Sequence, residues 1–146
     1  MINDTYPYYP SEDYSQFLFI SEGEQGKILK IILFEPLGNN EWNLGFGDLK
    51  HEGVDDSVMS SNHDAMKIIR TVARTTLDFC QEHPETILQI KPVDSKRGKL
   101  YNLVFQKYFT NIDAYFNIIG FTENVGEKYS PQKFYDYFKI SFKFVK

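Results

Sequence analysis

The sequence contains one cysteine, one tryptophan and three histidines among 146 residues, and these shortages exclude several classes of protein. The single cysteine, Cys80, cannot form an intramolecular disulfide, and no cysteine and histidine spacing matches a zinc site. The longest apolar run, residues 28–34, is interrupted by Lys30 and is far shorter than the ~20 residues that cross a bilayer. No charged start followed by an apolar core marks a signal peptide. We therefore expect a cytoplasmic protein with no cofactor and no membrane association.

The charge balance also limits the choice of partners. The net charge is −4, whereas domains that bind duplex DNA usually carry a strong basic excess. A local basic patch stays open. The hydrophobic fraction of 42% is ordinary for a soluble domain, and the length fits one core, so we expect a single domain over residues 1–146. Ten tyrosines and thirteen phenylalanines favour strands.

Hydrophobic periodicity predicts an α+β fold. A tyrosine-rich, irregular arm over residues 1–16 precedes alternating strand patterns and two stretches with helical spacing. The predicted strands cover residues 17–21, 27–34, 41–48, 87–90, 115–121 and 134–145, and the predicted helices cover 64–81 and 95–109. This order indicates a two-layer sandwich, in which two helices pack on an antiparallel or mixed sheet of about six strands.

Several short segments resemble a family of uncharacterised bacterial proteins, common in Bacteroidetes, with related small phage proteins. The segments are Asn43-Leu44-Gly45-Phe46-Gly47-Asp48, Asp55-Asp56, Ser61-Asn62-His63-Asp64, Thr71-Val72-Ala73 and Arg97-Gly98-Lys99-Leu100-Tyr101. The resemblance covers residues 27–120 and implies a helix-strand-helix arrangement, with no assigned chemistry. In that family a Gly-Ser-Thr sequence leads into the second helix, and here Pro92-Val93-Asp94 replaces it.

Basic residues begin the second predicted helix, where a helix least favours them. One interpretation is an anion site, in which free N–H groups and cationic side chains face a phosphate or carboxylate. Its candidate residues are Ser95, Lys96, Arg97, Lys99 and Tyr101. The alternative is structural: Asp94 caps the helix, and Arg97 pairs with an acidic residue of the segment 48–56.

Acidic residues cluster between the third predicted strand and the first helix. Paired carboxylates can hold Mg²⁺ or Mn²⁺, so Asp48, Asp55, Asp56 and Asp64 form a candidate acidic loop. Their spacing matches no metal-binding motif, so we assign no metal site, and a solvated loop is the alternative. We assign no catalytic residue either, because Cys80 lies on the apolar side of its helix and no nucleophile elbow is present.

The last predicted strand offers a candidate surface for a partner or for nucleic acid. Alternation places Tyr135, Tyr137, Lys139 and Lys143 on one face. Aromatic rings interleaved with cations are typical of surfaces that bind single strands. The alternative is a solvated face whose lysines protect an edge strand from aggregation.

These patterns lead to three hypotheses. The first is a small binding protein without catalytic machinery that serves in a phage, defence or toxin-antitoxin system, with a protein partner or through self-association. The second is a nucleic-acid-binding protein. The third is a metal-dependent enzyme that acts on phosphate-containing substrates.

Overall fold

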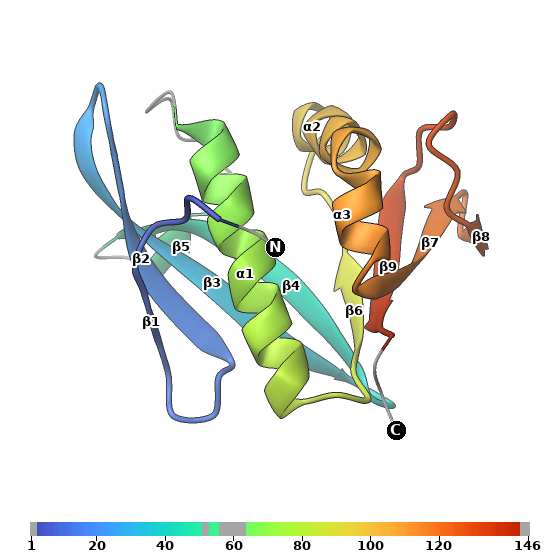
Figure 1. The fold of residues 1–146 in the computed structure, drawn as a ribbon, viewed down its shortest axis with the longest axis horizontal. Helices are drawn as coiled ribbons and strands as arrows, with labels where there is room; N and C mark the ends of the chain where they lie inside the picture. The colour runs from blue at the N-terminus through green and yellow to red at the C-terminus, as the bar shows by residue number, and fades with distance from the viewer. Residues whose placement is uncertain (1–2, 51–52, 56–63, 144–146) are drawn as a thin grey trace. The chain divides into compact units, whose positions relative to one another are not determined.

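The computed structural model describes residues 3–50, 53–55 and 64–143, which form an α+β fold with one open, mixed sheet (Figure 1). The strands are β1 (Tyr8–Pro10), β2 (Gln16–Gly23), β3 (Gly26–Gly38), β4 (Glu41–Lys50), β5 (Gly53–Asp55), β6 (Ile87–Ile90), β7 (Phe116–Thr122), β8 (Val125–Lys128) and β9 (Tyr137–Phe142). The helices are α1 (Ala65–Glu82), α2 (Ser95–Lys107) and α3 (Phe109–Asp113). The strand order is β1-β2-β3-β4-β6-β9-β7-β8, with β5 paired to β4. The parallel pairing of β4 with β6 makes the sheet mixed.

The predicted α+β class with a mixed sheet is confirmed. The prediction of about six strands and two helices was only roughly right, because three short strands and one short helix were not predicted. Within the arm that was predicted to be irregular, β1 pairs with β2, and Pro10 is tolerated there because an edge strand needs fewer backbone donors. The predicted loop after β7 contains β8, which follows a tight turn. Both turn residues, Glu123 and Asn124, have positive φ, as the commonest two-residue hairpin turn requires. The last strand begins at Tyr137, three residues later than predicted.

The chain divides into two compact units, and the single domain expected from the length stays a prediction. Unit 1 consists of Met1–Glu35 and Gly45–His83, and unit 2 consists of Pro36–Leu44 and Pro84–Lys146. In unit 1, β2 buries alternate side chains, among them Phe17 and Phe19. On β3, the buried Phe34 stacks on Phe79 of α1, with ring centroids 4.1 Å apart. The helix predicted over residues 64–81 agrees with α1 to within one residue at each end. Pro84 follows the helix and prevents its continuation.

The charged residue that interrupts the apolar run of β3 lies inside unit 1. Lys30 is the register partner of the buried Phe19, and its side chain is only 2% exposed. It forms an ion pair with Asp48 of β4, which is also buried. A buried lysine needs a bonded counter-charge, and Asp48 supplies it. The strand β3 therefore continues through Lys30 although this residue is charged.

Unit 2 contains two parallel strands separated by an antiparallel one. Both β6 and β7 pair antiparallel with β9, so the chain crosses from β6 through α2 and α3 to a strand two positions away. One face of these strands is apolar and buried, and Phe105 of α2 stacks on Phe138 of β9 at 4.1 Å. The loop residue Tyr129 packs against the same two rings. This aromatic core supports the first turn of α2, where the candidate site lies.

Candidate functional site

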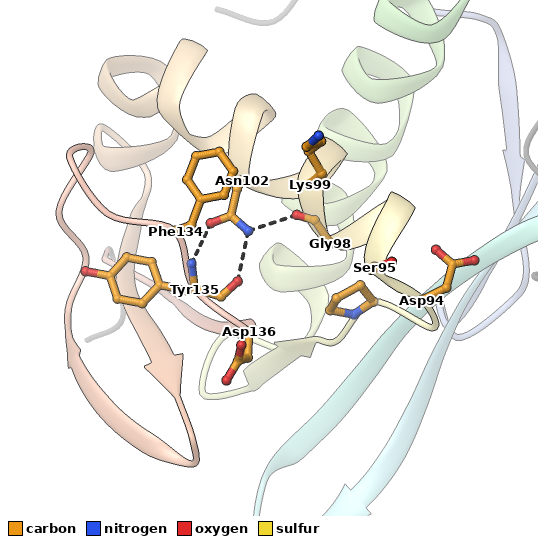
Figure 2. Close-up of a pocket in the computed structure, with 9 residues that line it drawn as sticks. Asp94, Ser95, Gly98, Lys99, Asn102, Phe134, Tyr135 and Asp136 are labelled. Atoms are coloured by element: carbon orange, nitrogen blue, oxygen red, sulfur yellow. Dashed lines mark hydrogen bonds between the residues drawn. The ribbon is translucent and has the colours of Figure 1, made fainter.

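A cleft of about 430 Å³ in unit 2 separates the first turns of α2 from the segment that leads into β9 (Figure 2). Its volume falls within the usual range of ligand sites. The residues that line it are Pro92, Asp94, Ser95, Gly98, Lys99, Asn102, Phe134, Tyr135 and Asp136. One wall is helical and the other is extended, so the cleft depends on what joins these two segments.

Asn102 joins the two walls. This side chain is 3% exposed, and its amide group donates to the carbonyl oxygens of Gly98 and Tyr135, each at 2.8 Å. Its Oδ1 accepts from the backbone N–H of Tyr135 at 2.7 Å. Asn102 thus pairs with both backbone groups of Tyr135 in the way that a neighbouring strand would. The separation of the two walls is fixed by a fully bonded side chain.

The first turn of α2 is capped from within. The extended residue Asp94 accepts from the backbone N–H of Arg97 at 2.8 Å, which confirms the predicted N-cap. Its other oxygen accepts from Arg97 Nη1 at 2.9 Å. The buried Arg97, one of the predicted anion-site residues, thereby compensates the charge of Asp94.

Three side chains at the cleft have exposed groups. The Phe134 ring is 54% exposed beside Asn102 (Figure 2). Lys99 is exposed and has no ion pair or hydrogen bond among the described residues. Asp136 is exposed, and one of its oxygens accepts from the backbone N–H of Glu123 at 2.8 Å. The cleft therefore combines an aromatic ring, a cation and a carboxylate.

The predicted anion-site residues do not gather at one point. Ser95 and Lys99 line the cleft, whereas Arg97 is turned toward Asp94. Lys96 is exposed, Tyr101 is half-buried, and neither lines the cleft. Anion binding by this turn stays a prediction.

The acidic residues that lie within the described chain serve as partners for other side chains of unit 1. Asp48 pairs with Lys30. Asp64 accepts from the Tyr6 hydroxyl at 2.5 Å and from Ser21 Oγ at 2.6 Å, and its carboxylate makes no capping bond to α1. The side chain of Asp55 and all of Asp56 lie outside the described residues. Within the described part of the chain, no three His, Cys, Asp or Glu side chains are grouped as a metal site requires.

The predicted surface on the last strand needs one correction. Tyr135 precedes β9, is buried, and donates its hydroxyl to Glu127 at 2.8 Å, so it does not share a face with Tyr137. The two-residue alternation fails there because Tyr135 is held by Asn102 and not by a neighbouring strand. Figure 2 shows its ring turned away from the first turn of α2.

The remaining residues of that surface are already engaged. Tyr137 stacks on Phe121 at 4.6 Å, with Lys91 Nζ 5.3 Å from the Tyr137 ring centroid. Lys139 pairs with Glu41 at 2.5 Å, and Lys143 pairs with Asp113 at 3.4 Å. These contacts form a bonded sheet face, in which neither ring is isolated.

Sequence reasoning missed Asn102, Phe134 and Asp136. Asn102 lies between two apolar residues of a helix, and a polar residue within an apolar stripe is a weak local signal. Phe134 and Asp136 were placed on a strand that in fact starts later. Only the long-range pairing of Asn102 with Tyr135 brings these residues together.

Cys80 does not act as a nucleophile in the folded protein. It is 1% exposed on α1, and burial raises the pKa of its thiol to about 12. A thiol with that pKa is protonated at neutral pH and therefore poorly reactive.

Comparison with known proteins places the chain in a family without a known function. No curated protein and no solved structure matches it. Among the described residues, no helix has the length and apolarity needed to span a bilayer. A family model described as "Family of unknown function (DUF6934)" matches residues 3–143. This match includes nearly the whole sequence, and the chain therefore belongs to the DUF6934 family.

Proposed function

We propose that this protein is a small binding protein whose unit 2 cleft holds a short segment of a partner protein. The observation that carries the proposal is the cleft itself, with walls fixed by Asn102 and an exposed Phe134 ring beside them. A preorganised cleft binds with little ordering cost, since its walls need not rearrange. Interface centres are typically built from such aromatic groups with a few polar ones around them.

The chemistry of the lining supports binding more than catalysis. Among the described residues that line the cleft there is no histidine or cysteine. Of its two carboxylates, Asp94 is paired with Arg97, and Asp136 accepts one hydrogen bond from the Glu123 backbone. A general acid or base needs a pKa matched to its task. The ion pair with Arg97 favours the charged form of Asp94 over a proton-transferring role.

The nucleic-acid alternative receives less support from the sheet face. Tyr137 and Phe121 are register partners on neighbouring strands, and their ring centroids are 4.6 Å apart, close to the spacing between strands. The two rings therefore stand upright on the sheet and face each other. Beyond Phe121 lies Gly126, where a Cβ would come 2.8 Å from the Phe121 ring. Lys91 lies over Tyr137. Bases stack on ring faces, and both outer faces of this pair are occupied.

The metal-dependent alternative is also weakened by what the acidic residues contact. Asp48 already has a lysine partner, and one oxygen of Asp64 already accepts two hydroxyl hydrogen bonds, which leaves only its Oδ1 without a bond. A Mg²⁺ ion requires several free oxygen ligands, and these two residues offer too few without displacement of their partners.

The cellular setting belongs to the same proposal. The resemblance to bacterial proteins of Bacteroidetes and to small phage proteins supports a role in a phage, defence or toxin-antitoxin system, within the cytoplasm. In such systems small proteins act by binding, so the partner is a protein or a second copy of this chain. This setting rests on analogy between sequences.

The test is a selection of random peptides displayed on phage against the immobilised protein, followed by NMR titration of the isotope-labelled protein with the enriched peptides. We expect shifts of the amide resonances of Lys99, Asn102 and residues 134–136. Phe134→Ala should weaken binding at least tenfold, because this truncation removes the largest exposed ring at the cleft.

Val125→Ala is the matched control, since Val125 is also an exposed apolar residue of unit 2 and lies on β8, and it is not among the residues that line the cleft. Its peptide affinities should equal those of the parent. Failure of any peptide to enrich, or shifts confined to other residues, would contradict the proposal.

A further inference from the structure

We infer that the segment held in the cleft presents a carboxylate to Lys99 and a cationic group to Asp136, and that it also carries an apolar side chain. This inference rests on the proposed function and specifies the chemistry of its ligand. It follows from three features of the cleft: which charges are compensated, where the free charges lie, and the space left beside a glycine.

The charges of the cleft are not equivalent. Asp94 is compensated by the buried Arg97, which bonds to it through both its backbone N–H and its guanidinium. Lys99 has no counter-charge among the described residues, and Asp136 has only a backbone N–H partner. A ligand therefore meets one uncompensated cation and one uncompensated carboxylate.

These two charges come from opposite walls. Lys99 belongs to α2 and Asp136 to the segment before β9, and Figure 2 shows them apart, with Asn102 and Gly98 between them in this view. A ligand with a single charge would satisfy one and leave the other. A ligand with both charges, in the matching order, satisfies each of them.

The lining also includes two apolar rings, those of Phe134 and Pro92, and Phe134 is 54% exposed. An apolar ligand side chain that covers these rings removes them from water, which is the favourable part of burial.

Gly98 leaves space that packing does not require. Its backbone is helical, and a Cβ added there would meet only Pro92, at 3.5 Å, which is ordinary van der Waals contact. Neither strain nor crowding therefore explains a glycine at this helical position, where glycine makes a helix less stable than alanine does. The missing side chain keeps the cleft open beside Pro92, as a site for a bulky ligand group requires.

The test uses a set of short blocked peptides of equal length, measured by NMR titration at low salt. The set comprises Ac-Glu-Leu-Lys-NH₂, its reverse Ac-Lys-Leu-Glu-NH₂, the singly charged Ac-Glu-Leu-Gln-NH₂ and Ac-Gln-Leu-Lys-NH₂, and the neutral Ac-Gln-Leu-Gln-NH₂. We expect one doubly charged order to bind best. Each charge should contribute about two- to fivefold in affinity, the range for exposed ion pairs.

The carboxylate and the cation of the inferred ligand are side chains of an internal segment. Unblocked Gly-Leu-Gly tests this source, because its charges lie on the termini alone. Preference for the blocked, doubly charged peptide supports the inference. Binding of Gly-Leu-Gly at the cleft in preference to the blocked set would overturn it in favour of a chain end.

Two conservative variants assign the charges to their residues. Lys99→Gln should abolish the preference for the glutamate-bearing peptides and leave the lysine preference intact. Asp136→Asn should do the opposite, while its side-chain oxygen can still accept from Glu123. Lys96→Gln is the control, because Lys96 is an exposed cation of the same helix turn that does not line the cleft.

The outcomes separate this inference from the proposed function. If phage-selected peptides bind at the cleft but the neutral peptide binds as well as the charged ones, the inference is overturned and the proposed function stands. The same holds if Lys99→Gln and Asp136→Asn behave like Lys96→Gln. If no selected peptide binds at the cleft, the proposed function itself fails.

Discussion

The two units use their polar groups in different ways. In unit 1, charged and hydroxyl groups are turned inward and bonded to one another: Lys30 with Asp48, and Tyr6 with Asp64. In unit 2, the core is aromatic, and an uncompensated cation and carboxylate, Lys99 and Asp136, remain at an open cleft. Polar groups that are bonded internally hold a structure together, whereas polar groups left open are available to a ligand.

This difference indicates which unit to mutate for which effect. Substitutions at the polar groups of unit 1 should change stability, because each removal leaves a buried partner unsatisfied. Substitutions at the open charges of the unit 2 cleft, Lys99 and Asp136, should change binding with small effects on stability, whereas Asn102, which is bonded internally, should behave like the polar groups of unit 1. The following predictions test this division in order of expected size.

The largest effect is expected from Lys30→Met in unit 1. Breaking a buried ion pair by removing one partner leaves an uncompensated charge, which costs about 3–5 kcal/mol of unfolding free energy. Urea denaturation measures it. Lys27→Met is the matched control, because Lys27 pairs with Glu22 at an exposed site and its loss should cost under about 1 kcal/mol.

The double variant Lys30→Met/Asp48→Leu sharpens the same comparison. Replacing both charges with apolar side chains removes the unsatisfied group, so most of the lost stability should return. If Lys30→Met costs no more than Lys27→Met, the internal ion pair does not stabilise unit 1 and the division between the units fails.

The second effect concerns the residue that joins the walls of the cleft. Asn102→Ala leaves the buried N–H and carbonyl of Tyr135 without partners, at a cost of about 2–3 kcal/mol. Denaturation gives the cost, and NMR should show broadened amide resonances for residues 134–136. Asn111→Ala, at an exposed position of α3, is the control and should be nearly neutral. Unchanged resonances in Asn102→Ala would show that another contact fixes the walls.

The third effect is overpacking at a buried glycine of β7. A Cβ at Gly120 would lie 2.5 Å from the Tyr135 ring, so Gly120→Ala forces that ring to move. We expect a loss of about 1–3 kcal/mol, measured by denaturation. In the background Tyr135→Ala, where the ring is absent, the same substitution should cost much less. Equal costs in both backgrounds would mean that the ring does not limit the space.

The fourth effect is a gain in stability, expected at another glycine of unit 2. Gly98→Ala should raise stability by about 0.5–1 kcal/mol, because alanine favours the helix and meets no clash. Its methyl group occupies part of the cleft beside Pro92, so peptide affinity should fall. A variant that is more stable and binds less well separates folding from binding. A gain in affinity would contradict the space argument.

The smallest effect is an alkaline sensitivity of unit 1. Burial, together with the hydrogen bond to Asp78, raises the pKa of Tyr8 from 10.0 to about 12. The unfolded chain loses this proton near pH 10 while the folded protein retains it, so stability falls as the pH rises from 10 to 12. Its contribution is fully present below pH 10. Tyr8→Phe should make that decline shallower in pH-dependent denaturation, whereas Tyr9→Phe, at a 67% exposed side chain, should not.

The parts of the fold that depend on local patterns could be predicted from the sequence. The amphipathic spacing and Pro84 located α1, and apolar segments on either side of the turn at residues 22–26 located β2 and β3. The short edge strand β8 was missed because its four residues are all exposed and carry no apolar alternation. The helix α3 was missed because it is a single short turn after α2.

The cleft could be predicted only in part, because half of it depends on contacts between distant residues. The capped first turn of α2 follows from Asp94 and the residues after it, and the sequence drew attention to this turn. The facing wall is set by Asn102 and Tyr135, which are 33 positions apart. Likewise, Asp48 was assigned to an acidic loop, since nothing near it in the sequence indicates Lys30 as its partner.

The position of β9 between β6 and β7 has a consequence for the order in which the protein is made. A ribosome releases β6, α2, α3, β7 and β8 before β9 emerges, yet β9 is the strand that joins the first to the others. Until then the facing edges of β6 and β7 lack their partner, and nascent chains with open strand edges are prone to wrong pairing. The two edges therefore stay open until residues 137–142 have been synthesised and can pair with them.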